Sequence, residues 1–339
     1  MSVVLLDKKH FLFDIETSGL NKQTDHIVCI GISFVNDENE IANKQWSLLV
    51  PEEEKDLLKH FLAFITSFSH AYTYGGKLFD WPFLINRCLY YELDITLLQR
   101  IHVIDMKKHL HYLGPTRTAL ENALNIVRQF TTNGKSLVKV YHTYKSCGET
   151  IYLSLILGHN QDELRSLLGF YELYQTLYQL QYFKCIEIKQ SSNTLDFTLE
   201  VPYTFITDFE GHYKHITLSW KSRTQHLKIQ VAFSYLALKQ YLTPHKDYYY
   251  ILSQNQLMHR SLAHFIPSCD KRKVSKEECV VIKESAYIPI FTTHKLTLPI
   301  WYDISHMPYL SLDDFSFSIL ANQLFALFFS SIHNKKHAY

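Results

Sequence analysis

The first 106 residues alternate between strand-like and helix-like segments, and this alternation restricts the fold more than any other feature of the chain. The five strand-like segments lie at residues 10–17, 27–35, 45–50, 71–74 and 101–106. The first three can pair as antiparallel neighbours, whereas the last two flank a helical segment, as in a β-α-β connection. Helical patterns continue to about residue 181. The sequence therefore predicts an α/β domain over residues 1–184, with a mixed five-stranded sheet flanked by helices.

From residue 185 the pattern changes to short alternating strands separated by turns. The clearest of these strands lie at residues 185–190, 194–201, 215–219, 227–233 and 248–252. An apolar segment at residues 313–333 predicts one closing helix. Because 339 residues exceed what one compact core usually holds, we expect a second, smaller β-rich domain of the α+β kind over residues 185–339.

Composition excludes several classes of protein. Apolar residues make up 47% and charged residues 20% of the chain, which is the balance of a globular protein. No run approaches the ~18 apolar residues of a membrane helix, and the charged opening MSVVLLDKKHFLFDIE does not fit a signal peptide. Six widely spaced cysteines without a CxxC pair argue against a disulfide framework or a zinc knuckle. We therefore expect a cytoplasmic protein with no membrane partner and no organic cofactor.

The charge of the chain is divided unevenly. Residues 214–276 contain eleven Lys and Arg against two Asp, a net charge of +9, so with a total of +1 the rest of the chain carries −8. A basic segment joined to an acidic remainder indicates a polyanionic partner for the former and a carboxylate-rich site in the latter.

Two carboxylates, Asp14 and Glu16, lie in the first strand-like segment. Side chains two residues apart on a strand point to the same face, and two such carboxylates raise each other's pKa unless a cation lies between them. The neighbouring Phe13 and Ile15 are apolar, so we expect the pair at the end of a buried strand. Alone, such a pair is weak evidence, because it is more often a chance feature of a solvated strand.

A second motif is YGGKLFDWPF, at residues 74–83. A strand ends in Gly75 and Gly76, and Asp80 precedes a helix that begins with Trp81. Asp is a preferred N-cap residue, so Asp80 can be explained as a cap alone. Paired glycines also let a ligand approach the backbone closely, and Lys77 can then meet a phosphate.

A third motif, GHNQDEL at residues 158–164, is predicted to open a helix that runs to about residue 180. Asn160 and Glu163 have the spacing of a capping box, which is a purely structural device. His159 and Asp162 lie three residues apart and therefore on one side of the helix. A lone His at a helix start is more often a cap or surface residue, but His159 can also act there as a general base or orient the site.

Together the three motifs resemble the DEDD 3′–5′ exonucleases of the ribonuclease H-like superfamily, and among them the YprB-type domains. The resemblance covers residues 8–182 and is carried by FDIETSGL (13–20), YTYGGKLFDWPFLINR (72–87), HVIDM (102–106) and LGHNQDELRSL (157–167). It implies a ribonuclease H-like fold and a site that binds two Mg²⁺ or Mn²⁺ ions through Asp14, Glu16, Asp80 and Asp162. Better-studied members place a His five, or a Tyr four, residues before the final Asp, whereas His159 stands three before Asp162.

The resemblance implies a metal-dependent nuclease that hydrolyses phosphodiester bonds, with a 3′–5′ exonuclease as the leading hypothesis. Two cations can generate a hydroxide and stabilise the leaving oxygen in such a reaction. Two alternatives stay open: an endonuclease with the same site, and a catalytically silent nucleic-acid-binding or scaffold protein. All four carboxylates are present, which argues against the silent protein, because a module that only binds a polyanion gains nothing from clustered acids.

The basic segment also carries many aromatic residues. Sheet surfaces that combine cations with exposed rings commonly hold single-stranded nucleic acid, although aromatic side chains in a β domain are as often part of its core. We therefore predict that Lys271, Arg272 and Lys273, together with Lys77, contact nucleic acid, either DNA or RNA.

Overall fold

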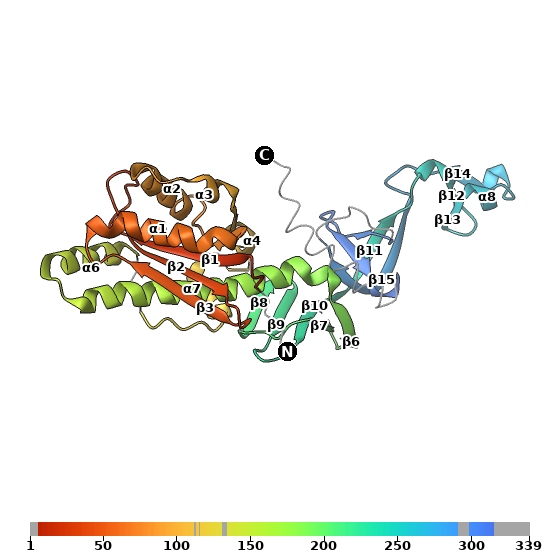
Figure 1. Ribbon diagram of the computed structural model, residues 1–339. Helices are drawn as coiled ribbons and strands as arrows, with labels where there is room; N and C mark the ends of the chain where they lie inside the picture. The colour runs from red at the N-terminus through yellow and green to blue at the C-terminus, as the bar shows by residue number, and fades with distance from the viewer. Residues whose placement is uncertain (1–5, 112, 115, 131–133, 291–297, 315–339) are drawn as a thin grey trace. The chain divides into compact units, whose positions relative to one another are not determined.

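The structure is a computed structural model that describes residues 6–111, 113–114, 116–130, 134–290 and 298–314 (Figure 1). The chain divides into two compact units. Unit 1 comprises Met1–Lys184, Leu199–Tyr213 and Thr217–Lys228, and unit 2 comprises Cys185–Thr198, Lys214–Ile216 and Ile229–Tyr339. No helix in the described part of the chain is long and apolar enough to cross a membrane. From residue 315 on, the helix predicted at 313–333 lies outside the described residues.

Unit 1 is built on a mixed five-stranded sheet in the order β3-β2-β1-β4-β5, which confirms the predicted fold class. Its strands are β1 (His10–Thr17), β2 (Ile27–Val35), β3 (Ile41–Ser47), β4 (His70–Thr73) and β5 (His102–Asp105). β1 pairs antiparallel with β2, and β2 with β3, whereas β4 and β5 extend the sheet in parallel. The mixed order follows from the connections, because turns join the first three strands and helices join the last two.

β3 lies earlier in the chain than the predicted strand at residues 45–50. The Asn36 side chain accepts a hydrogen bond from the Glu40 N–H at 2.8 Å, and this tight turn pairs Val35 with Ile41 directly after it. The exposed polar residues in the middle of β3 conceal the alternation that a sequence pattern relies on. The turn, and not hydrophobicity, therefore sets where β3 begins.

Helices cover both faces of this sheet (Figure 1). The α-helices of unit 1 are α1 (Glu54–Phe64), α2 (Asp80–Tyr90), α3 (Thr96–Arg100), α4 (Lys107–Leu110), α5 (Arg117–Ala123), α6 (Gly134–Cys147) and α7 (Thr150–Gln179). Alternation along β1 sends the Phe13 ring into a core with α1 and α2, 5.8 Å from the Phe61 ring and 5.4 Å from the Trp81 ring. Asp14 and Glu16 consequently lie on the opposite face, toward α7.

α7 is one continuous helix of 30 residues, so the prediction that a helix begins at Gly158 is wrong. Residues 150–157 are a short, largely apolar run, for which periodicity does not separate helix from strand. Gly158 lies in the helix interior because it makes room for Phe130, whose ring would lie 2.3 Å from a Cβ at that position. Further along α7, Glu172 accepts the N–H groups of Ile206 at 2.5 Å and Thr207 at 3.0 Å.

The chain after α7 is rich in strands, as predicted, and forms a five-stranded sheet (β6-β7-β10-β9-β8), a closed barrel (β11-β15-β17-β16) and a three-stranded sheet (β13-β12-β14). The strands are β6 (Lys184–Gln190), β7 (Thr194–Glu200), β8 (Phe209–Tyr213), β9 (Ile216–Trp220), β10 (His226–Ala232), β11 (Ser234–Tyr241), β12 (Tyr248–Ile251), β13 (Gln256–His259), β14 (Lys271–Lys273), β15 (Val280–Pro289), β16 (Trp301–Tyr302) and β17 (Pro308–Ser311). A short helix, α8 (Arg260–Ala263), lies between β13 and β14. The five predicted strands correspond to β6, β7, β9, β10 and β12, with ends within one residue.

A buried ion pair joins α1 to α2 in unit 1. Arg87 Nη2 donates to Glu54 Oε2 at 2.6 Å, and the two side chains are 1% and 0% exposed. The same carboxylate accepts the Ile27 N–H at the start of β2 at 2.8 Å and the Tyr91 hydroxyl at 3.1 Å. Both charges are thus compensated by hydrogen bonds, which is the condition for burying an ion pair.

We predict that Arg87→Met lowers the free energy of unfolding by about 3–5 kcal/mol, because it leaves Glu54 buried without its cation. Urea unfolding followed by circular dichroism measures this change. The control is Lys59→Met, which removes an exposed partner of Asp56 (Nζ–Oδ1 2.9 Å) and should leave the midpoint almost unchanged. Equal effects of the two substitutions would contradict the prediction.

Candidate active site

Asp14 and Glu16 form the first part of a carboxylate cluster. Nδ2 of Asn160 in α7 donates to Asp14 Oδ2 at 2.9 Å. Burial, followed by repulsion from Glu163 and Asp80, holds the pKa of Asp14 well above its usual range. Burial, followed by repulsion from Asp14, does the same to the pKa of Glu16. A raised pKa means that the charged form of each carboxylate is disfavoured unless a cation lies beside it.

Asp80 joins the cluster from the first turn of α2. At Gly76 a Cβ would lie 2.2 Å from Asp80 Oδ2, so the glycine lets this carboxylate approach, and Gly75 before it adopts a φ of 87°. The helix N-cap is Phe79, and no side-chain capping bond forms, so Asp80 is not the cap. Burial raises the pKa of Asp80 to about 7, although the Arg117 guanidinium opposes the rise.

Glu163 is the acid that α7 turns toward this cluster, and its charge raises the pKa of each of the three carboxylates. Arg128 Nη1 donates to Glu163 Oε1 at 2.8 Å, and Arg117 Nη2 pairs with Oε2. Arg128 also pairs with Glu121 of α5, with Nη2 and Oε1 2.5 Å apart. The arginines therefore hold Glu163 in a fixed network at the edge of the cluster.

His159 stands between two acids of the cluster. Its Nε2 lies 3.4 Å from Glu163 Oε1 and 3.8 Å from Glu16 Oε1, while its buried Nδ1 has no hydrogen-bond partner among the described residues. Burial lowers the pKa of His159, so the ring is neutral at neutral pH. A neutral imidazole beside two carboxylates can accept a proton.

The structure does not bring Asp162, the predicted fourth acid, to these carboxylates. Its Oδ2 accepts the Phe130 N–H at 2.7 Å, and its Oδ1 accepts a hydrogen bond from Arg165 Nη1 at 2.6 Å. Successive residues of a helix point about 100° apart, so Asp162 and Glu163 face different surroundings. Asp162 instead anchors the chain segment whose Phe130 ring packs over Gly158.

The four predicted nucleic-acid contacts have different surroundings. Lys77 donates to a carbonyl oxygen of β5 at 3.1 Å. Lys271 donates at 2.7 Å to the carbonyl oxygen at the end of α8, and Arg272 pairs with Glu278 at 3.0 Å. Lys273 is exposed. Lys77 and Lys271 therefore each have a structural contact, whereas Arg272 presents its guanidinium at the surface.

The cluster suits a divalent cation by its chemistry. Carboxylate oxygens are the ligands that Mg²⁺ and Mn²⁺ prefer, and a cation would offset the burial and the repulsion that raise these pKa values. Among the described residues, however, no group of three or more His, Cys, Asp or Glu side chains is close enough to hold a metal ion. The carboxylates would have to come closer together in order to coordinate one ion jointly.

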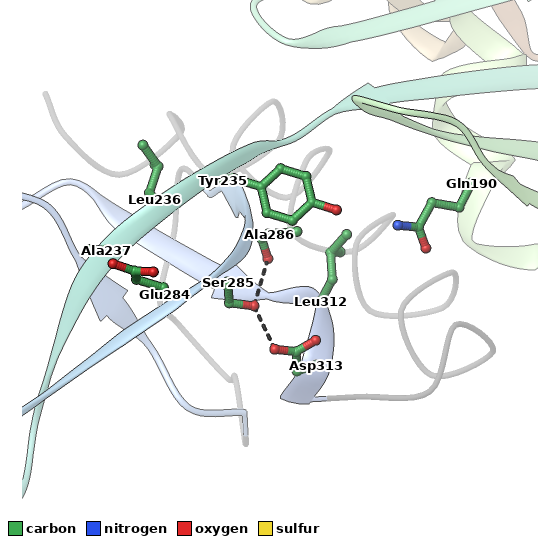
Figure 2. Close-up of a pocket in the computed structure, with 9 residues that line it drawn as sticks. All are labelled: Gln190, Tyr235, Leu236, Ala237, Glu284, Ser285, Ala286, Leu312 and Asp313. Atoms are coloured by element: carbon green, nitrogen blue, oxygen red, sulfur yellow. Dashed lines mark hydrogen bonds between the residues drawn. The ribbon is translucent and has the colours of Figure 1, made fainter.

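Unit 2 contains a separate cavity of about 700 Å³ (Figure 2). The cavity is lined by Gln190, Tyr235, Leu236, Ala237, Glu284, Ser285, Ala286, Leu312 and Asp313. The Ser285 hydroxyl donates to Asp313 Oδ2 at 2.7 Å. None of the predicted site residues lines this cavity.

A family model described as the RNase H superfamily matches residues 11–197, which is more than half of the chain. The chain belongs to the RNase H superfamily. This confirms the ribonuclease H-like part of the resemblance. No curated protein matches the sequence.

Solved structures similar to this one include two DNA enzymes. The family B DNA polymerase from the hyperthermophilic archaeon Pyrobaculum calidifontis is 9% identical, with a TM-score of 0.41 over 93% of this chain and 41% of the polymerase. E. coli exonuclease I in complex with a dT13 oligonucleotide is 12% identical, with a TM-score of 0.29 over 62% of this chain and 54% of the exonuclease. The chain thus spans 41% and 54% of the length of these two proteins.

The sequence motifs of this superfamily member did not single out Glu163, Arg117 or Asn160 as part of a site. For Glu163 a signal was available, because His159 and Glu163 are four residues apart on one helix face. For Arg117 there was none, since it belongs to no motif and reaches the cluster only through the placement of α5.

We predict that Asp80→Asn stabilises the chain in EDTA, and increasingly so from pH 4 to pH 8. Folding raises the pKa of Asp80 from its ordinary 3.8 to about 7, so the folded state binds the proton more tightly and loses stability as the pH rises. The gain at pH 8 should be about 1–3 kcal/mol, measured by urea unfolding. Asp37→Asn, in an exposed turn, is the control. Parallel pH profiles for Asp80→Asn and the parent would refute the prediction.

Proposed function

We propose that this chain is a metal-dependent nuclease that hydrolyses phosphodiester bonds and removes nucleotides from the 3′ end of nucleic acid. Membership of the RNase H superfamily supports a nuclease. The observation that carries the proposal is the cluster of Asp14, Glu16, Asp80 and Glu163, in which burial, together with repulsion between the acids, raises the pKa values of the first three. Within the superfamily we place the chain with the YprB-type domains of the DEDD exonucleases, on the motifs at residues 13–20 and 72–87.

We infer that Asp14, Glu16, Asp80 and Glu163 would hold two Mg²⁺ or Mn²⁺ ions. Glu163 takes the role expected for Asp162, because Glu163 lies within electrostatic reach of the other three carboxylates while Asp162 is bonded to Phe130. When bound, the ions would supply a water of lowered pKa and stabilise the charge that develops on the phosphate.

The other polar residues of the cluster serve the same reaction. Neutral His159 would accept a proton at Nε2, the nitrogen that faces Glu16 and Glu163. Arg117 and Arg128 keep the Glu163 carboxylate in place and offset part of the negative charge. The Arg117 side chain is 26% exposed, so its guanidinium can also be reached from solvent.

We further propose that residues 1–184 are the catalytic domain and residues 185–339 an accessory domain that contacts DNA or RNA. The exposed cations Arg272 and Lys273 support this contact, and Lys77 lies three residues before Asp80 in the chain. The six cysteines are free thiols, which fits the cytoplasmic location that we propose.

The test compares two neighbouring acids on α7. With labelled single-stranded DNA and RNA in Mn²⁺ or Mg²⁺, the parent chain should release mononucleotides, and EDTA should stop the reaction. Glu163→Gln should lower the rate at least about 100-fold, because it removes a charge from the metal-binding cluster. Asp162→Asn should remain within a few-fold of the parent, although it weakens the anchor of Phe130.

Other outcomes have distinct meanings. Full activity of Glu163→Gln together with loss of activity in Asp162→Asn would overturn the assignment of Glu163. Internal fragments instead of mononucleotides would identify an endonuclease with the same site. If the parent chain cleaves nothing with either ion, the nuclease proposal fails and a silent nucleic-acid-binding or scaffold protein takes its place.

A further inference from the structure

The three-stranded sheet of unit 2 sorts its side chains onto two faces. β12 lies between β13 and β14 and pairs antiparallel with both. Tyr248 pairs with His259, and Tyr250 pairs with Leu257 on one side and Arg272 on the other. Directly paired residues of antiparallel strands point to the same face. Tyr248, Tyr250, Leu257, His259 and Arg272 therefore share one face, which we call the tyrosine face.

The opposite face of this sheet is covered by α8. Ile251 of β12 and Ala263 of α8 are both 0% exposed. Lys271 Nζ of β14 donates to the Ala263 carbonyl oxygen at 2.7 Å. The tyrosine face has no such cover within the described residues. The hydrogen bonds, ring contacts and ion pairs of Tyr248, Tyr250, His259 and Arg272 all run to residues between 248 and 278.

The tyrosine face combines aromatic rings with a cation. The Arg272 guanidinium lies 4.8 Å from the centroid of the Tyr250 ring, and the Tyr248 and His259 rings are 5.3 Å apart. Rings on alternate residues of a strand can each stack with a base, while a guanidinium beside them meets a phosphate. The face lies in the segment 214–276, whose net charge of +9 complements a polyanion.

We propose that the tyrosine face binds single-stranded nucleic acid, with bases stacked on Tyr248 and Tyr250 and a phosphate on Arg272. Stacking on a side chain requires an unpaired base, so the ligand is a single strand and not a duplex. The choice of ligand rests on the proposed nuclease function, because the face would hold the substrate of that reaction.

The contact between Glu278 and Arg272 indicates where a phosphate of the ligand would bind. Its Oε1 lies 3.0 Å from Arg272 Nη2 and its Oε2 lies 3.1 Å from Nη1, so the carboxylate takes both arms of the guanidinium. A phosphate makes the same two-pronged contact. Glu278 therefore competes with the ligand for Arg272, and removing its charge should strengthen binding.

The experiment measures fluorescence anisotropy of labelled 20-nucleotide oligo-dT and oligo-U with the full chain in EDTA, where no cleavage is expected. Tyr248→Ala and Tyr250→Ala should each weaken binding about tenfold, whereas the Phe variants, which keep the rings, should bind like the parent. Arg272→Ala should weaken binding and reduce its salt dependence, and Glu278→Gln should strengthen it several-fold. An unlabelled duplex should compete far less well than an unlabelled single strand.

Matched controls come from the same unit. Tyr235 is 71% exposed outside this face, and Tyr235→Ala should bind like the parent. Glu187 pairs with exposed Lys189 at 2.8 Å, so Glu187→Gln removes an equivalent charge and should have little effect. Circular dichroism establishes that each variant is folded.

Unchanged affinity of folded Tyr248→Ala and Tyr250→Ala, or equal effects of Glu278→Gln and Glu187→Gln, would overturn the proposal. Equal competition by duplex would overturn base stacking as the mode of binding. Binding is measured in EDTA and so does not depend on cleavage. If the chain cleaves nothing with Mn²⁺ or Mg²⁺, the nuclease proposal fails, but the anisotropy measurement still tests whether the tyrosine face binds single strands.

Discussion

The arrangement of unit 1 depends on one buried amide, that of Asn160. Its Nδ2 donates to Asp14 on β1, and its Oδ1 accepts hydrogen bonds from Gln45 on β3 at 2.8 Å and from the Cys29 thiol on β2 at 3.6 Å. Gly31 on β2 permits this approach, because a Cβ there would lie 2.0 Å from Asn160 Oδ1. A fully buried amide must satisfy its polar atoms, and these hydrogen bonds fasten α7 to all three strands.

The orientation of α7 about its own axis, which the Asn160 hydrogen bonds fix, also determines which charged side chains face the site. His159 and Glu163 face the carboxylates, and Asp162 turns away toward Phe130. The carboxylates repel one another, and within the described residues Arg117 and Arg128 supply the compensating charge next to Glu163. The site therefore combines carboxylates that repel one another with guanidinium groups that offset part of their charge, and an added cation would shift this balance.

Much of the fold could be predicted from the sequence, and the site only in part. Period-two alternation was enough to place β1 and β2 and to put Asp14 and Glu16 on one face, because that property is local. That α7 is one helix could not be foreseen, because the glycine in its interior, Gly158, is explained only by the Phe130 ring from another part of the chain.

The choice between Asp162 and Glu163 likewise depends on a helix rotation that tertiary contacts decide. Arg117 reaches the cluster because of where α5 packs, and no sequence motif predicts that packing.

The length of α7 has a mechanical consequence. Glu163 and Glu172 lie nine residues apart on the same unbroken helix, a separation of about 14 Å along its axis. Glu172 accepts hydrogen bonds from the backbone N–H groups of Ile206 and Thr207, so these two residues are bonded to the same helix that carries Glu163. Gly169 between the two acids is closely packed, since a Cβ there would lie 2.8 Å from the Ile126 side chain. One continuous helix therefore connects the cluster acid Glu163 to the backbone of residues 206–207.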